Sequence, residues 1–454
     1  MVNKLKTSLL LLTVFFTNKA FAQSNILTLQ ECIEIGVKNN LSLKGQGEDI
    51  RKAQLEQSKS RAKLLPVING FGNFMNNVVV GTSVSDGSGM GAMLGIEMPY
   101  MVSKGLRYNT SAGAQIAMPL YNQTLYSSIS IAKKMKELKQ FSYEKAKEDI
   151  TVEISKIYFL AQTMVEQVKL IDENIKRLSA LVEITNAFYD NGMAMDVDLK
   201  RVNINLENQA IQKANSEAMY QQQLNLLKFM LDLPMEAEFS LTPVSIDYVN
   251  TPKLIGVSRN LNDFKMLYFQ RDIIDKQNRA INQEYIPTLS LVGQLGYTNY
   301  TDHFENYFHS NKSNSLNKWH NSFYWGVSLR VPIFDGFDKR LNRKKVDIDY
   351  IKVQYQIKDT EQKMETQYKN AMNDWTNNYR NFNKQKENLS LAQDVYSVTA
   401  SRYKEGIVSM TELLQDEMRL TEAQHNFINA SYNCRVTELS LLKLTGKLDQ
   451  LSNK

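Results

Sequence analysis

Few side chains in this 454-residue sequence could bind a metal, and those few are poorly spaced for it. Three of its four histidines, His303, His309 and His320, lie in one polar stretch together with Asp302 and Glu305. Zinc sites hold their ligands at short, characteristic separations, and these intervals match none of the known patterns. We therefore predict an exposed loop at these histidines, with neither a metal nor another cofactor.

Two cysteines, Cys32 and Cys434, stand near opposite ends of the chain. In an exported protein they could join in one long-range disulfide. Cys434 also falls on an apolar helix row, described below, which favours a packed thiol instead. Both alternatives stay open here, and two cysteines are too few for a structural zinc site.

The sequence also lacks the short motifs that carry known catalytic mechanisms. It contains no G-x-S-x-G, no H-E-x-x-H, no P-loop and no G-x-G-x-x-G. Because no nucleophile stands beside a base in a recognisable arrangement, we predict that the protein is not an enzyme. Its 8 prolines and 20 glycines are few for this length and indicate that long helices position whatever site exists.

The first 22 residues have the three parts of a secretory signal peptide. Two early lysines precede an apolar segment at 8–16, and Ala20-Phe21-Ala22 is a cleavage site, so we expect the mature chain to begin at Gln23. Loss of the three lysines in this segment lowers the formal net charge from +6 to +3, which argues against a nucleic-acid partner. Beyond it, no apolar run reaches the ~18 residues of a membrane-spanning helix.

Landmarks that recur at nearly constant separation indicate an internal duplication. Pro66, after two leucines, returns as Pro287, 221 positions later, and Gly192 returns as Gly406, 214 positions later. We predict a division of the mature chain into four parts. These are a first repeat at 23–232, a connector at 233–259 with one short helix or strand, a second repeat at 260–446 and a tail at 447–454.

Four segments alternate between apolar and polar residues, the period of a β-strand. They lie at about 67–78 and 108–118 in the first repeat and at about 288–299 and 323–331 in the second. Half-buried strands of a soluble sheet would alternate in the same way. Their length of ~10–13 residues, close to the ~9–11 of outer-membrane strands, and their aromatic ends favour strands of an outer membrane instead. Four strands cannot close a barrel, whereas three chains would supply twelve.

Each repeat is expected to begin with one helix and to end in a long helical hairpin. Thr28 and Glu31 form a capping box that starts the first helix, which we expect to run towards Pro66. The two hairpins turn near Gly192 and near Gly406. The return helix of the second hairpin carries a strict heptad of core positions: Leu413, Leu420, Phe427, Cys434 and Leu441. The predicted fold is mixed α and β, and mainly α.

These residues together resemble the TolC-like outer membrane efflux protein family. The motifs that carry the resemblance follow one another in family order along nearly the whole mature chain: Thr28-Leu29-Gln30-Glu31-Cys32-Ile33, Lys38-Asn39-Asn40, Leu64-Leu65-Pro66, Val331-Pro332-Ile333-Phe334-Asp335-Gly336 and Arg402-Tyr403-x-x-Gly406-x-x-Ser409. The resemblance implies a homotrimer whose twelve-stranded barrel crosses the outer membrane and continues into a helical tunnel in the periplasm. It also implies an inner-membrane transporter and a periplasmic adaptor as partners, with outer-membrane lipid around the barrel.

The resemblance further suggests residues for a gate at the periplasmic end of the tunnel. Asp198, six residues past Gly192, and Glu412 match acidic sites of the family, and Tyr403 matches its tyrosine. Val408 stands where some members carry an arginine, and Gln415 stands at a second acidic site. We therefore expect the gate to be weaker here or to be held closed by different contacts. Three copies of each carboxylate would form a ring that attracts cations. The alternative is that both are solvated residues that favour the start of a helix.

The tips of the two hairpins are the expected docking sites of the adaptor. Gly192, Gly406 and Ser409 are the candidate residues there. We therefore predict an outer-membrane exit duct that serves a tripartite efflux pump or a type I secretion system, two machines that the sequence does not separate. A non-conducting structural coiled coil of the periplasm or a surface adhesion protein is the alternative. The sequence does not identify the exported substrate.

Overall fold

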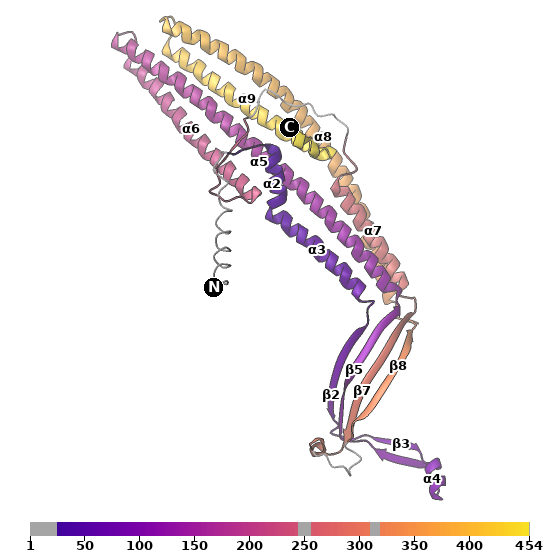
Figure 1. Ribbon diagram of the computed structural model, residues 1–454. Coiled ribbons are helices and arrows are strands. Elements are labelled where there is room, and N and C mark those ends of the chain that lie inside the picture. Colours follow the sequence, from indigo (N-terminus) through magenta and orange to yellow (C-terminus); the bar gives the residue numbers. More distant parts are fainter. Residues whose placement is uncertain (1–24, 244–255, 309–317, 454) are drawn as a thin grey trace, which may run out of the picture. The chain divides into compact units, whose positions relative to one another are not determined.

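The computed structural model describes residues 25–243, 256–308 and 318–453, in two compact units (Figure 1). The first unit combines segments 1–50, 138–269 and 353–454, and the second combines 51–137 and 270–352. Each unit draws on both predicted repeats, and the division of the sequence into repeats stays a prediction. The predicted signal peptide at 1–22 and His309 lie outside the described residues. None of the described helices is long and apolar enough to cross a membrane.

The second unit contains an antiparallel sheet of four strands in the order β2-β5-β7-β8 (Figure 1). These strands are β2 (Val67–Asn76), β5 (Tyr108–Tyr121), β7 (Thr288–Thr301) and β8 (His320–Arg330). Each lies on one of the segments chosen by alternation, with ends that differ by up to three residues. His320, which we placed in an exposed loop, opens β8 and pairs with Thr298. The pairing of β8 with β7 continues past the alternating segment, so the strand includes His320.

The register gives this sheet one apolar and one polar face. Ile116 of β5 pairs with Gly293 of β7, which pairs with Trp325 of β8, so the three share a face. The same face carries many further apolar side chains: Ile68, Phe74, Ala114, Met118, Leu289, Leu291, Leu295, Phe323, Val327 and Leu329. The opposite face carries mostly polar or small ones: Asn69, Asn73, Ser111, Gln115, Thr288, Ser290, Gln294, Tyr324, Ser328 and Arg330.

Two glycines on the polar face make room for an aromatic ring. Gly113 pairs with Phe71 on one side and with Gly296 on the other. A Cβ added to Gly113 would lie 2.8 Å from Cζ of Phe71 and 2.3 Å from the carbonyl oxygen of Leu295. The ring of Phe71 therefore lies across both glycines and covers backbone that has no side chain of its own.

The segment between β2 and β5 contains structure of its own. Strands β3 (Thr82–Asp86) and β4 (Tyr100–Lys104) form an antiparallel pair, and helix α4 (Ser88–Leu94) belongs to the segment that connects them along the chain. The loop after β7 contains a single 3-10 turn, η1 (Phe304–Tyr307), among the residues described there.

The opening helix is divided where we expected one continuous helix. Helix α2 (Leu29–Asn39) begins with the capping box of Thr28 and Glu31, as predicted, and α3 (Leu41–Ala62) follows it. Asn40 causes the break. Its side-chain oxygen accepts the backbone N–H groups of Ser42 and Leu43, so it caps the second helix, while its amide donates to the carbonyl of Met230.

Two long helical hairpins form most of the rest. The first pairs α5 (Gln123–Asp190) with α6 (Asp196–Leu231), and the second pairs α8 (Asp338–Lys404) with α9 (Met410–Thr445). Helix α7 (Asn262–Gln283) precedes β7, and η2 (Leu448–Asn453) follows α9. In the connector, β6 (Phe239–Leu241) is the one short strand among the residues described there, and it pairs in parallel with β1 (Asn25–Leu27). Pro252 lies outside the described part.

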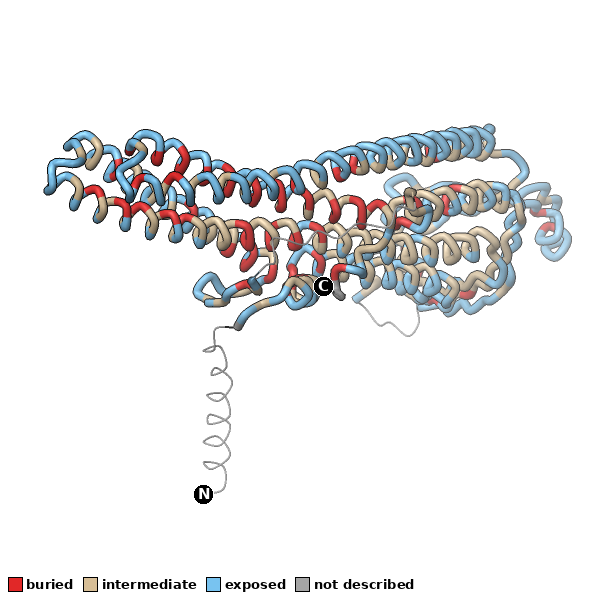
Figure 2. Tube along the Cα trace, turned by 90° about the horizontal axis from the view of Figure 1, so that it is seen from above, coloured by how far each residue is buried: buried red, intermediate tan, exposed pale blue. Residues whose placement is uncertain are grey.

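The core of the first unit follows the predicted heptad. Buried residues line the sides of the long helices that face their neighbours (Figure 2). All five heptad residues of α9 are buried: Leu413, Leu420, Phe427, Cys434 and Leu441. Cys32 is buried in a different cluster, and both thiols are free, so the disulfide is not formed. Burial raises the pKa of the Cys32 thiol to about 12 and that of Cys434 to about 11.

Gly36 on α2 allows the closest approach to α5 and α6. A Cβ added there would lie 2.2 Å from Cδ1 of Ile154, which is fully buried, and 3.2 Å from Leu231. We expect Gly36→Ala to lower the thermal midpoint, because overpacking costs about 1–3 kcal/mol. Gly45→Ala on α3 meets nothing within 4 Å and is the control, expected to stabilise by up to about 1 kcal/mol. Equal midpoints for the two variants would contradict this packing.

Candidate functional site at the hairpin tips

The two hairpins turn in the same way. Gly192 and Gly406 both have positive φ, 71° and 74°, which favours glycine. In the first turn the N–H of Met193 donates to the carbonyl of Phe188, at 2.8 Å. In the second, the N–H of Ile407 donates to the carbonyl of Arg402, at 2.9 Å. Each turn thus satisfies a carbonyl at the end of the incoming helix, and glycine adopts this conformation without the steric cost that a Cβ brings.

Each return helix begins with a cap from a residue singled out in the sequence. The hydroxyl of Ser409 accepts the N–H of Glu412 at 3.2 Å, and a carboxylate oxygen of Asp198 accepts the N–H of Met195 at 3.4 Å. Ser409 therefore has a local structural task, whether or not a partner also contacts it.

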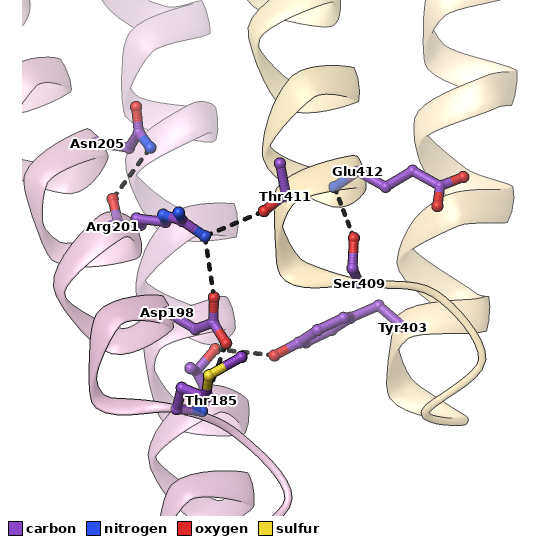
Figure 3. Close-up of polar contacts among 9 residues, drawn as sticks. Thr185, Asp198, Arg201, Asn205, Tyr403, Ser409, Thr411 and Glu412 are labelled. Carbon is purple, nitrogen blue, oxygen red and sulfur yellow. Dashed lines mark hydrogen bonds and ion pairs between the residues drawn. The ribbon is translucent and has the colours of Figure 1, made fainter.

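Asp198 belongs to a polar link between the two hairpins (Figure 3). Its side chain pairs with Arg201 of α6 at 3.3 Å, and the same arginine nitrogen donates to the hydroxyl of Thr411 on α9 at 3.1 Å. Sequence reasoning missed Arg201, although a basic residue three positions after Asp198 is an ordinary helical pair. The arginine that bridges the hairpins thus comes from α6, while Val408 stands where some relatives were expected to have one.

Tyr403 forms a second link between the hairpins, and this one is buried. Its ring is 5% exposed and lies 5.6 Å from the ring of Phe188. Its hydroxyl lies 3.5 Å from that of Thr185, which gives its own proton to the carbonyl of Leu181 at 2.7 Å, so Tyr403 is the donor. Burial raises the pKa of Tyr403, and the charge of Asp198 adds to that, while the contact with Thr185 opposes it. The group is neutral at physiological pH.

An apolar cluster surrounds Tyr403 and holds the two hairpins together. Its buried members come from all four long helices: Leu178, Leu181, Val202, Tyr403, Met410, Leu413 and Leu414. Val408 packs against the same cluster. An arginine at position 408 would bring a charge to this apolar surface, which a valine avoids. The cation that bridges the two hairpins is instead Arg201 of α6.

The structure does not bring Glu412 together with Asp198. The side chain of Glu412 is exposed and points away from the Asp198–Arg201 pair (Figure 3). It lines a groove between α8 and α9, of about 830 Å³, together with Gln415, Arg402 and Arg419. Within one chain, the two candidate carboxylates therefore occupy different surfaces.

No group of three or more histidine, cysteine or carboxylate residues in the described part of the chain could hold a metal. Of the histidines singled out in the sequence, His303 follows β7 and His320 opens β8, and they do not meet at a common centre.

With this geometry described, the chain can be compared with known proteins. The family model described as outer membrane efflux protein matches residues 33–232 and 260–447, so the chain belongs to that family. It is a transport protein of the bacterial outer membrane, with most of its chain in the periplasm. The family consists of channels of efflux pumps and is not a class of enzymes.

Individual relatives agree with this assignment. The outer membrane protein TolC of Escherichia coli K12 is 20% identical over 385 residues, which cover 80% of this chain and 74% of TolC. The TolC of Vibrio cholerae is 18% identical over 357 residues, covering 75% and 77%. Sequence therefore relates the chain to this class across most of its length.

Solved structures show the same fold. The channel CusC superposes with a TM-score of 0.72 at 15% identity, covering 95% of each chain. VceC of Vibrio cholerae gives 0.70 at 13% identity, covering 92% and 96%. The open state of MtrE from Neisseria gonorrhoeae gives 0.70 at 17% identity, covering 92% and 89%.

The packing of Tyr403 can be tested without any assay of transport. Tyr403→Ala removes a buried ring from the apolar cluster, which we expect to loosen the end of α8 at a cost of about 3–5 kcal/mol. Trypsin should then cleave faster after the nearby Lys404. Tyr355→Ala on the same helix is the control, because that ring is 70% exposed. Unchanged cleavage of Tyr403→Ala would show that the ring does not hold the tip.

Proposed function

We propose that the protein is the exit duct of a tripartite efflux pump or a type I secretion system, and that it works as a passive homotrimeric channel. The observation that carries the proposal is the division of the four-stranded sheet into an apolar and a polar face. Apolar side chains on one face suit lipid, and polar side chains on the other suit a water-filled interior. An adhesion protein or a structural coiled coil has no need of this division.

The free edges of the sheet support the trimer. In the strand order, β2 and β8 each pair on one side only with the strands that the structure describes. Unpaired backbone groups are intolerable in lipid, so both edges need another strand. Because β2 and β8 run in opposite directions, β8 of one copy can pair antiparallel with β2 of the next. Three copies would close a barrel of twelve strands, followed by a helical tunnel.

Apolar side chains at the tips support docking of a periplasmic adaptor, which would connect the duct to an inner-membrane transporter. Met193, Met195 and Val197 beside the first turn are 68%, 72% and 51% exposed, and Ile407 beside the second is 65% exposed. Such residues near Gly192 and Gly406 indicate a surface that another protein covers. Ser409 is engaged in its helix cap and would contribute mainly by shaping this surface.

The assembly itself can be tested by electron microscopy of the protein purified from outer membranes in detergent. We expect three-fold particles with a detergent belt at one end, because the apolar face of the sheet needs lipid or detergent. Monomeric particles without a belt would reject the duct and favour the structural coiled coil.

Ion selectivity tests the two carboxylates. In planar bilayers we expect Asp198→Ala combined with Glu412→Ala to lower the preference for cations, since each trimer loses six negative charges near its entrance. Glu56→Gln on α3 also removes a carboxylate and should leave selectivity unchanged. If the reversal potential of the double variant in a salt gradient equals that of the unmodified protein, these residues are only helix caps and surface charges.

Leakage tests the link at the tips. Arg201→Ala removes the bond between α6 and Thr411, which is worth about 1 kcal/mol, so the ratio of open to closed tips should rise about fivefold. Cells that carry this variant should be more sensitive to an antibiotic too large for ordinary porins. Arg61→Ala on α3 makes the same change of charge away from the tips. Equal sensitivity of the two strains would exclude Arg201 from the closure.

A further inference from the structure

A buried carboxylate on α9 has no role in the tip contacts described so far. The side chain of Glu417 is 5% exposed, and Arg177 of α5 pairs with it at 3.3 Å. The guanidinium of Arg177 also donates to the side-chain oxygen of Asn174, which is 1% exposed. The amide of Asn174 in turn donates to Gln424 at 3.0 Å and to Thr421 at 3.3 Å. Two residues of α5 are thus joined to three of α9.

Few other charged or titratable groups face Glu417. From α8, Tyr396 lies under the guanidinium of Arg177, at 5.5 Å from the ring centroid, and burial raises its pKa to about 12, so it stays neutral. On α9 itself, the neighbouring Asp416 is directed to other partners, Thr399 at 2.7 Å and Arg419 at 3.2 Å. Arg177 is therefore the cation that balances Glu417 among the described residues.

The pair is only partly satisfied. The second carboxylate oxygen of Glu417 and the Nε of Arg177 are both buried without a hydrogen-bond partner in the described part of the chain. Removing a charge from water costs free energy that one such contact does not fully return. Protonation of Glu417 would remove the charge and leave the carboxylic acid in place.

We propose that Glu417 is an acid-responsive clasp between α5 and α9, whose protonated form holds the two hairpins packed and whose ionised form weakens that packing. The clasp deepens the proposed function and rests on it, since the hairpins of a duct must separate when its periplasmic end opens. It differs from the Thr185–Tyr403 contact, which joins two neutral groups.

The direction of the response follows from burial. Burial raises the pKa of Glu417 above its ordinary value, against the smaller opposing effects of Arg177 and of the Tyr396 hydroxyl. The packed arrangement therefore binds the proton more tightly than a separated one. Its extra stability is fully present below the ordinary pKa of glutamate, about 4.5, and is lost as the pH rises through the raised pKa. One carboxyl can change the ratio of packed to separated hairpins by at most about tenfold per pH unit.

Hydrogen exchange of the full-length protein in detergent tests the clasp. The quantity measured is the protection of amides in residues 413–424, corrected for intrinsic exchange, at about pH 5 and about pH 7.5. We expect the unmodified protein to be better protected at the lower pH. Glu417→Gln should be equally well protected at both, because it keeps the shape of the protonated acid. Glu422→Gln, an exposed position of the same helix, should respond as the unmodified protein does.

Arg177→Met provides a second variant with a distinct signature. It leaves Glu417 buried without its cation, so protection should fall at about pH 7.5 and recover at about pH 5. A Glu417→Gln variant that keeps the full pH response would overturn the proposal. So would protection that is independent of pH in both the unmodified protein and Arg177→Met.

Conductance of the same preparations separates this proposal from the proposed function. If protection follows the expected pattern but the protein does not conduct ions in bilayers, the duct is rejected and the clasp remains as a property of the bundle. If the protein conducts but Glu417→Gln keeps the full pH response of protection, the duct stands and the clasp is rejected.

Discussion

The unpaired edges of the four-stranded sheet are the constraint on which the rest of the structure depends. A strand in lipid cannot leave backbone N–H and C=O groups without partners, and β2 and β8 each have one such side in the chain as described. In the proposed trimer the sheet continues into the next copy, which requires an even number of antiparallel strands and a matched register. The alternation of side chains, the paired glycines under Phe71 and the opposite directions of the edge strands all serve that closure.

If the protein is a gated duct, as proposed, its helical bundle must hold two hairpins together without fixing them permanently. An entirely apolar interface would be strong and insensitive to its surroundings. The contacts between the hairpins instead combine the apolar cluster around Tyr403 with the polar links of Arg201 and Arg177. Such links add little net stability, but they depend on geometry and on charge, so the balance between packed and separated hairpins can be shifted at modest cost.

Periodicity predicted most of the fold because the features concerned repeat locally. Alternation located the four strands, a heptad located the buried face of α9, and two glycines located the turns. The break at Asn40 was missed although its cap on Ser42 and Leu43 is local, because the helical pattern continues on both sides of it; the contact with Met230 is distant in sequence. The hairpin of β3 and β4 was missed because its segment is rich in glycine and methionine and has no clear period. The bridge from Arg201 to Thr411 and the pair of Glu417 with Arg177 were missed because each joins two different helices, and no local pattern encodes such a contact.

The burial of the two cysteines has a consequence for how the protein matures. Cys32 and Cys434 have no exposed surface, and their thiols ionise only at a pH far above that of the periplasm. Since the thiolate is the reactive form, the folded chain resists the enzymes that introduce disulfides into exported proteins. The thiols are open to oxidation only between export and packing of the bundle. Burial in the packed bundle therefore protects both thiols from oxidation.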